Sequence, residues 1–382
     1  MNNSTTFHSL TPSLPTLPLE LIDEILTQES LSKSDLARCC LVSRQFLQSS
    51  RPVLYSTLTI ELRRASRLLE RDPAYTVQRS SHSLLETLRS LPDLRITTKL
   101  VFKGVSRLKP RASSVRPIKP SKLLQETLQL LPRLNQVSFR GIKVRGADLI
   151  LTNEGSRWKR LHSDSQVGLR QSAEESPFKN LEELSCSIGT TNGVNTIYLP
   201  PSLKVLNIIR IYSRLVMIKN APTSILRSLR LGFSSLCKLR NVPQLPHLVH
   251  LRLDMSGEDE CVPGAPSSRA VNTVASCRSL ISLSLYLEHS SYEPLVPHFL
   301  RQLPSTLLYL NFPGTLPLFD TVLPIVESGT LDSIRAIRFP ATSLTDGLLN
   351  LKRRVRGEAL ELNTTLRRDS VSLYSSRTFD SL

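Results

Sequence analysis

The sequence predicts an α/β protein in which a small three-helix unit precedes an irregular solenoid of short parallel strands with helical crossovers. Two observations lead to this fold class: a leucine pattern that recurs between positions 100 and 339, and three helical segments before position 60. The chain has 382 residues, of which 40% are apolar and 21% are charged, so most of it can bury a core. Aromatic residues make up only 5%, so that core is mainly aliphatic.

The recurring pattern is L-x-x-L-x-L, in which apolar and polar residues alternate at the end. Alternation places the last two apolar side chains on one side of a short strand. One strand cannot bury that side alone, whereas parallel neighbours stacked on each other bury it as a continuous core. The clearest copies centre on Leu184, Leu206, Leu229, Leu251, Leu283, Leu310 and Ile337. Degenerate copies precede them at 134–139 and 100–102.

The spacing of these copies resembles that of leucine-rich repeats, whose units span roughly 20–29 residues. Successive centres are 22, 23, 22, 32, 27 and 27 residues apart. Helical stretches at 83–91, 122–131 and 294–303 each end in Leu-Pro before a copy, and we expect them to form crossovers. We therefore expect a repeat array over residues 63–349, with a basic loop at 103–122 and an insertion at 254–273.

Three helices are predicted before the array. Pro18 suits the first turn of a helix that carries apolar residues at 21, 22, 25 and 26. Ser32 followed by Asp35 indicates a capping box for a second helix through Val42. Ser43 can cap a third helix, which Pro52 is expected to end.

These segments together resemble an F-box. The resemblance lies in the order and spacing of LPLELIDEIL (17–26), SDLARCCLVSRQF (34–46) and RPVLYSTLTI (51–60), although the stretch 27–33 is about two residues longer than the commonest form. It implies a module at 16–62 that binds a Skp1-like linker and, through it, a cullin. The chain would then be the substrate-recognition subunit of a Skp1–cullin–F-box ubiquitin ligase. The Skp1 contacts implied by the resemblance are Leu17, Pro18, Ile22, Ile25, Leu26, Leu36, Cys40, Val42, Phe46 and Leu54.

The repeat array is expected to bind an unknown target protein. In each copy the residue between the last two leucines points away from the core, and the candidate target contacts among these are Asn207, Arg230, Arg252, Asn311 and Arg338. Arg230 and Arg252 fall on neighbouring strands, roughly 4.8 Å apart. Two alternatives follow for this pair: an acidic or phosphorylated substrate bridges both guanidiniums, or the two side chains fan apart into solvent.

The charge balance favours an acidic partner. The formal net charge is +17 and the sequence pI is about 10.0. The alternative function is a basic repeat scaffold that binds nucleic acid or an acidic protein without any ligase role. Nucleic acid is the less favoured partner, because the basic loop lacks the aromatic residues on which single-stranded bases stack.

We expect no enzymatic activity, metal or cofactor. The chain contains none of the nucleophile-elbow, phosphate-loop, zinc-protease or dinucleotide-binding motifs. Its six cysteines form no C-x-x-C pair. No window approaches 18 uninterrupted apolar residues, and no Lys or Arg precedes position 33, so we expect neither a membrane span nor a signal segment. The expected location is cytoplasmic and/or nuclear, with a disordered 1–15 and a flexible tail at 350–382.

Overall fold

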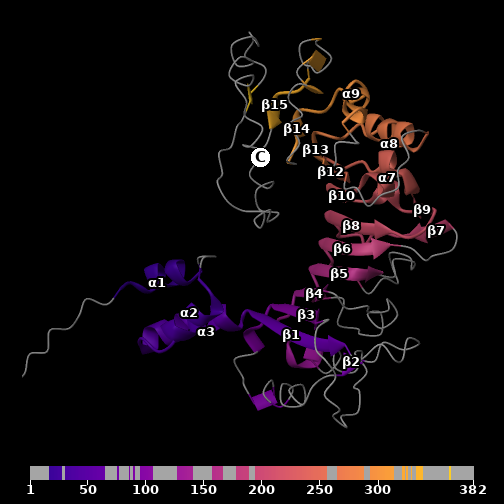
Figure 1. Cartoon of the computed structure of the whole chain (residues 1–382). Helices are drawn as coiled ribbons and strands as arrows, with labels where there is room; N and C mark the ends of the chain where they lie inside the picture. The colour runs from indigo at the N-terminus through magenta and orange to yellow at the C-terminus, as the bar shows by residue number, and fades with distance from the viewer. Residues whose placement is uncertain are drawn as a thin grey trace, which may run out of the picture.

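The structure is a computed structural model in which a helical unit leads into an arc of stacked parallel strands (Figure 1). It describes residues 17–27, 31–64, 75–76, 86, 89–90, 95–105, 127–140, 157–166, 178–188, 194–255, 265–287, 293–313, 321–322, 324–325, 328, 333–338 and 361–362. Within these ranges, none of the helices has the length and apolar character needed to cross a bilayer.

The helical unit consists of α1 (Leu19–Leu26), α2 (Lys33–Cys39) and α3 (Arg44–Tyr55). The three predicted helices are present, but the second ends at Cys39 and not at Val42. The unit has a small core of its own around Ile22, Leu26 and Leu36, separate from the core of the sheet. The prediction that Pro52 ends the third helix is wrong, because Pro52 lies inside α3. Proline removes a single N–H donor, and at Pro52 that loss falls in the last turn of the helix.

The main sheet has 13 strands, and every pairing in it is parallel except that of β2 with β1. Its strands are β1 (Thr57–Arg64), β2 (Tyr75–Thr76), β3 (Lys99–Val105), β4 (Gln136–Arg140), β5 (Arg160–Gln166), β6 (Glu183–Ile188), β8 (Val205–Ile211), β10 (Ser228–Gly232), β12 (His250–Met255), β13 (Ser282–Leu287), β14 (Tyr309–Asn311), β15 (Ala336–Arg338) and β16 (Glu361–Leu362). Apart from β2, which lies at the outer edge beside β1, consecutive strands of this sheet are neighbours in space, which is the arrangement of a solenoid.

The leucine pattern sets the register of this sheet, as predicted. Leu184 is opposite Leu206, which is opposite Leu229, and the row continues through the centre of every later copy to Ile337. These side chains are at most 1% exposed and belong to one core cluster that extends from Ile60 to Ile337. The repeat array is therefore a leucine-rich-repeat solenoid.

A backbone ladder runs alongside the strands and joins each repeat to the next. The carbonyl of Ser56 accepts the N–H groups of Thr98 and Lys99, and the carbonyl of Thr98 accepts those of Asn135 and Gln136. The same doubled hydrogen bond recurs between repeats up to Arg335 and Ala336, which bond to the carbonyl of Leu308. Since Ser56 is also the C-cap of α3, the helical unit runs directly into the solenoid without a linker.

Two of the strands that the sequence did not predict, β1 and β5, were missed for the same reason. Strand β1 lies within the predicted 16–62 module, but it pairs in parallel with β3 over seven residues and places Ile60 in the solenoid core. Strand β5 follows Trp158, which is 1% exposed and takes the place of the first leucine of a repeat. In both copies an aromatic residue, Tyr55 or Trp158, stands where the pattern demands leucine, so a search for leucines misses them.

The return segments opposite the main sheet differ between the long and the short repeats. The longer repeats carry α8 (Ala265–Ala275) and α9 (Leu295–Leu300), and the expected crossover at 294–303 is confirmed. The 22- and 23-residue repeats leave less chain for the return, and they use a three-stranded sheet, two 3₁₀ turns and one short helix. These elements are β7 (Val194–Ile197), β9 (Leu215–Ile218), β11 (Leu239–Arg240), η3 (Ala221–Thr223), η4 (Val242–Gln244) and α7 (Phe233–Lys238).

Asparagine side chains hold this second sheet to its turns. Asn220 bonds the backbone of Leu199 twice: its Oδ1 accepts from the N–H at 2.9 Å and its Nδ2 donates to the carbonyl at 2.7 Å. One repeat later, Asn241 donates to the carbonyl of Ile218 at 3.0 Å. Asn241 has a φ of 67°, a left-handed conformation that asparagine tolerates better than most residues.

Several predicted boundaries shift. Residues 103–105 belong to β3, so only 106–122 of the expected basic loop lies outside the described residues. Of the expected insertion at 254–273, Asp254 and Met255 end β12 and 265–273 lie in α8, while 256–264 are not described. Strand β16 extends the sheet into the expected tail, because it pairs with β15 beyond the predicted end of the array at 349. The expected disordered segment 1–15 lies outside the described residues.

Candidate functional site

Two surfaces of the described chain could bind partners: the outside of the helical unit and the concave face of the sheet. The helical unit is held in shape by two serine caps. Ser32 accepts the N–H of Asp35 while the Asp35 carboxylate accepts the N–H of Ser32, which confirms the predicted capping box. Ser43 accepts the N–H of Phe46 and caps α3, also as predicted. The Ser32 hydroxyl also donates to the Asp35 carboxylate at 2.6 Å, and this bond, together with the one from the Ser32 N–H, lowers the pKa of the Asp35 carboxyl.

Helix α1 carries two apolar stripes, and only one of them is buried. Ile22 and Leu26 are each 1% exposed and pack against α2 and α3. Leu21 and Ile25, which are also four residues apart and therefore adjacent on the helix surface, are 46% and 43% exposed. An eight-residue helix in a three-helix unit cannot turn both stripes inward, so one remains in contact with solvent.

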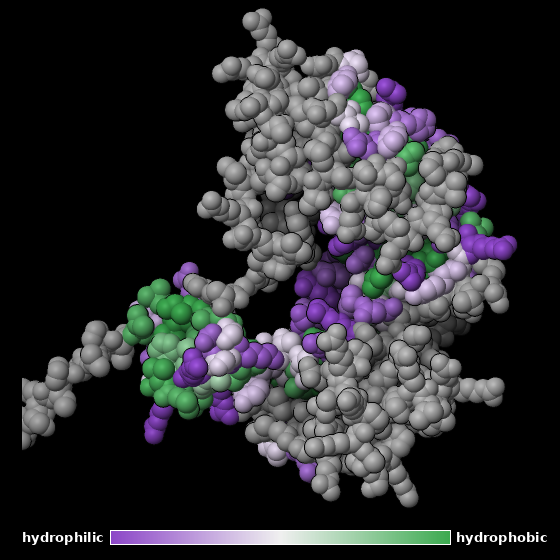
Figure 2. Space-filling view, in the orientation of Figure 1, coloured by the Kyte–Doolittle hydropathy of each residue, from purple (hydrophilic) through white to green (hydrophobic). Residues whose placement is uncertain are grey.

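The exposed apolar surface continues beyond this stripe. Leu17 and Leu19 are about half exposed at the start of α1, and Leu41 and Val42 stand out in the turn between α2 and α3, with exposures of 87% and 66%. Figure 2 shows hydrophobic side chains gathered over the helical unit. We call this set the apolar docking face: Leu17, Leu19, Leu21, Ile25, Leu41 and Val42.

The structure divides the predicted Skp1 contacts into three groups. Four are exposed on the helical unit: Leu17, Pro18, Ile25 and Val42. Three are half-buried: Cys40, Phe46 and Leu54. The other three, Ile22, Leu26 and Leu36, fill the core of the unit and do not reach its surface. Sequence reasoning missed Leu19, Leu21 and Leu41, although the four-residue spacing of Leu21 and Ile25 already indicates a second apolar stripe.

The concave face of the sheet is polar, and hydrophilic side chains line the hollow of the arc (Figure 2). The predicted target contacts form one row across it, since Asn207 is opposite Arg230, Arg230 is opposite Arg252, and Asn311 is opposite Arg338. Side chains on neighbouring strands of this row form hydrogen bonds with each other. Asn207 donates to Ser185 at 3.1 Å, and Asn311 donates to Ser284 at 3.4 Å.

Asp254 lies between the two central arginines. Its Oδ2 accepts from Nε of Arg230 and its Oδ1 accepts from Nε of Arg252, both at 2.9 Å. The Arg252 guanidinium also lies 5.6 Å from the centre of the Tyr286 ring, within the range of a cation–π contact. The two arginine side chains therefore do not fan apart into solvent, because the Asp254 carboxylate of the same chain binds both of them. Sequence reasoning missed Asp254 by assigning it to an insertion instead of to β12.

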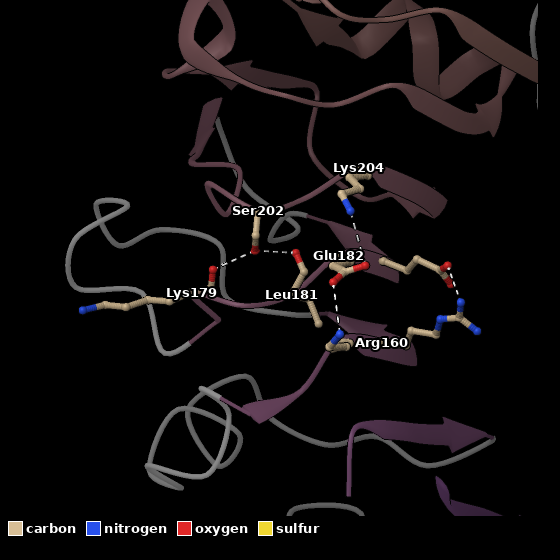
Figure 3. A network of polar contacts seen from close by, with 8 residues as sticks. Arg160, Lys179, Leu181, Glu182, Ser202 and Lys204 are labelled. Atoms are coloured by element: carbon tan, nitrogen blue, oxygen red, sulfur yellow. Dashed lines mark hydrogen bonds and ion pairs between the residues drawn. The ribbon is translucent and has the colours of Figure 1, made fainter. Parts of the chain in front are cut away.

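A second chain of charges follows the edge where the strands begin. Glu182 lies 3.6 Å from Nζ of Lys159 and 3.5 Å from Nζ of Lys204, so one carboxylate serves two ammonium groups (Figure 3). Arg160 and Glu183 form a separate pair at 3.1 Å. These side chains are partly exposed, and contacts of this kind typically contribute less than about 1 kcal/mol each. They order the edge of the face without neutralising its positive charge.

The described residues hold no cluster of possible metal ligands, and two of their cysteines are buried. No three His, Cys, Asp or Glu side chains within the described ranges are grouped as a metal site requires. Burial raises the pKa of the Cys186 and Cys277 thiols to about 12. Both thiols are thus protonated at neutral pH and poor nucleophiles.

No protein-family model matches the chain, and no curated protein matches it. Among solved structures it is similar to the leucine-rich repeat-containing protein LegL7 from Legionella pneumophila, with 13% identity and a TM-score of 0.35 over 75% of this chain and 84% of that chain. It is also similar to the TLR13–ssRNA13 complex, with 14% identity and a TM-score of 0.30 over 65% of this chain and 36% of that chain. The parallel register and buried leucine rows define the class: a leucine-rich-repeat solenoid with a helical unit at its N-terminal end.

Proposed function

We propose that this protein is the substrate-recognition subunit of a Skp1–cullin–F-box ubiquitin ligase. In this proposal the helical unit binds a Skp1-like linker, and the solenoid binds a target protein. The chain catalyses nothing itself and acts by positioning the target. The location expected for this role is cytoplasmic and/or nuclear.

The observation that carries the proposal is the apolar docking face. Six of the nine large hydrophobic residues exposed on the described chain lie between positions 17 and 42. An exposed apolar patch of this kind marks a protein-binding surface. Burying a fully exposed leucine or isoleucine contributes roughly 1.5–3 kcal/mol, so half-exposed side chains such as Leu21 and Ile25 would contribute about half of that each.

The resemblance of 17–60 to an F-box supports the choice of partner. The three helices, their two serine caps and their connection to a leucine-rich solenoid are consistent with such a module. The geometry changes which residues would make the contact. We propose that the apolar docking face meets the linker, while Ile22, Leu26 and Leu36 hold the helices together behind it.

Co-expression of the full chain with Skp1, followed by size-exclusion chromatography, tests the proposal. We expect a complex with the wild-type chain and none with the double variant Leu21→Asp/Ile25→Asp. The matched control is Ile225→Asp, an isoleucine 38% exposed on the solenoid, which should leave the complex intact. Separate elution of the wild-type chain and Skp1 would refute the proposal.

The alternative of a basic scaffold predicts a different result. Such a protein would bind random-sequence duplex DNA with an affinity that falls steeply as salt rises. The ligase adaptor should show no such binding at physiological salt. The net charge of +17 is compatible with DNA binding, so the DNA-binding measurement is needed to distinguish the two functions.

A further inference from the structure

We propose that the concave face at β8–β13 binds an acidic, unphosphorylated segment of a partner protein, with one carboxylate on the Arg230–Asp254–Arg252 cluster and an apolar side chain on Ile209. This inference rests on the target-binding half of the proposed function and specifies the chemistry of the target.

The donors come from the two arginines. A guanidinium carries five N–H donors, and that of Arg230 donates its Nε–H to Asp254. The Arg230 side chain is 43% exposed, so a ligand in the hollow can reach it. Asp254 holds the two guanidiniums in a fixed relation, and Tyr286 supports that of Arg252. The cluster is thereby ordered before any ligand arrives, which reduces the entropy lost on binding.

The charge of the cluster selects a monoanion. Two guanidiniums and one carboxylate leave a net charge of one positive unit. An aspartate or glutamate side chain neutralises that unit. A phosphate group carries about two negative charges at neutral pH, and it would leave the site negative beside Asp254. We therefore expect acidic residues to be preferred over phosphorylated ones.

The row next to the arginines holds a glycine on β10 and an exposed isoleucine on β8. Asp254 is opposite Gly232 on one side and Tyr286 on the other. Gly232 has no side chain, so this position of β10 adds none between Asp254 and β8. On β8 the pairing with β6 shifts between Ile208 and Arg210, and Ile209 is the extra residue of this bulge. Ile209 is 43% exposed, an apolar group at the rim of a charged site. Bulges commonly re-aim a side chain next to a functional site.

The distance between Ile209 and the arginine cluster sets the spacing of the matching residues in the ligand. Strands β8 and β12 are two apart in the sheet, which corresponds to roughly 10 Å at about 4.8 Å per strand. An extended peptide crossing the strands covers that distance in about three residues. The preferred segment therefore carries an apolar residue about three positions from an aspartate or glutamate.

A random decapeptide display library selected on the full-length chain tests this inference. We expect the enriched peptides to share an acidic residue about three positions from Leu, Ile or Val. An enriched peptide is then labelled with fluorescein, and its binding is measured by fluorescence anisotropy. Arg230→Ala/Arg252→Ala should weaken binding at least about tenfold, and Ile209→Ser severalfold.

The matched control is Arg214→Ala/Arg278→Ala, which removes the same net charge from two exposed arginines outside the cluster. It should reduce binding less than twofold. Enrichment without acidic residues, or equal loss in both double variants, would overturn the proposal. A phosphoserine version that binds more tightly than the glutamate peptide would overturn the choice of monoanion. Skp1 co-elution of the Arg230→Ala/Arg252→Ala chain reports separately on the apolar docking face, so the two proposals can fail independently.

Discussion

Asp254 binds Arg230 across two neighbouring strands of the solenoid, with Oδ2 of the carboxylate 2.9 Å from Nε of the guanidinium. The same carboxylate binds Arg252 on its own strand at the same distance. Two arginines that face each other in register would repel, and Asp254 converts the pair into an ordered cluster. The concave face thus carries a positive site that is already organised.

Replacing Asp254 should destabilise the fold modestly, and the loss should depend on salt. Asp254→Asn leaves the two guanidiniums adjacent, so we expect the free energy of unfolding to fall by about 1 kcal/mol at low ionic strength and by less at high ionic strength. Urea unfolding at two salt concentrations measures both values. The charge-free variant Arg230→Gln/Arg252→Gln/Asp254→Asn should recover most of the loss. A triple variant less stable than Asp254→Asn would show that repulsion is not the cause.

The asparagine that closes the second sheet should contribute more than any surface ion pair. Asn220→Ala leaves both backbone groups of Leu199, which is 0% exposed, without their side-chain partner. Each buried polar group left unsatisfied costs roughly 1–3 kcal/mol, so we expect a loss of about 2 kcal/mol or more. The control Asn272→Ala, on the exposed face of α8, should change stability by less than about 0.5 kcal/mol. Equal effects of the two substitutions would contradict this role of Asn220.

The capping box of α2 offers a test that depends on pH. Hydrogen bonds from Ser32 hold the pKa of Asp35 below its ordinary value. A lowered folded-state pKa adds stability above the unfolded-state pKa, and this contribution disappears as the pH falls through the folded-state value. NMR titration of Ser32→Ala should show the Asp35 pKa moving up toward its ordinary value. The control Ser34→Ala, two residues further on, should leave it unchanged.

The repeat array was largely predictable from the sequence because its register follows a local pattern. An L-x-L segment must bury one side, and only parallel stacking does so for many copies at once. The pattern failed where aromatic residues replaced the first leucine, at Tyr55 and Trp158. It also failed where the 22- and 23-residue repeats return through short strands and 3₁₀ turns. The Arg230–Asp254 contact was hidden for another reason. Asp254 looked like the start of an acidic insertion, and only the strand register places it beside Arg230.

The two stripes of α1 should respond differently to the same substitution. Ile22→Ala removes a side chain from the core of the helical unit, and we expect a loss of about 2–4 kcal/mol in the stability of that unit. Ile25→Ala, on the exposed stripe, should cost less than about 1 kcal/mol but weaken Skp1 binding. Thermal unfolding followed by circular dichroism, together with a binding assay, separates the two effects. A stability loss of the same size in both variants would mean that Ile25 is a core residue.

Calorimetric titration of Skp1 into the full-length chain tests the central claim most directly, namely that the apolar docking face is the surface that joins this solenoid to a ligase. We predict binding tighter than about 1 μM, with a negative heat-capacity change from apolar burial and little dependence on salt. The Leu21→Asp/Ile25→Asp chain should give no heat of binding while keeping its folded circular dichroism spectrum. The absence of binding by the wild-type chain, or equal binding by the double variant, would contradict the claim.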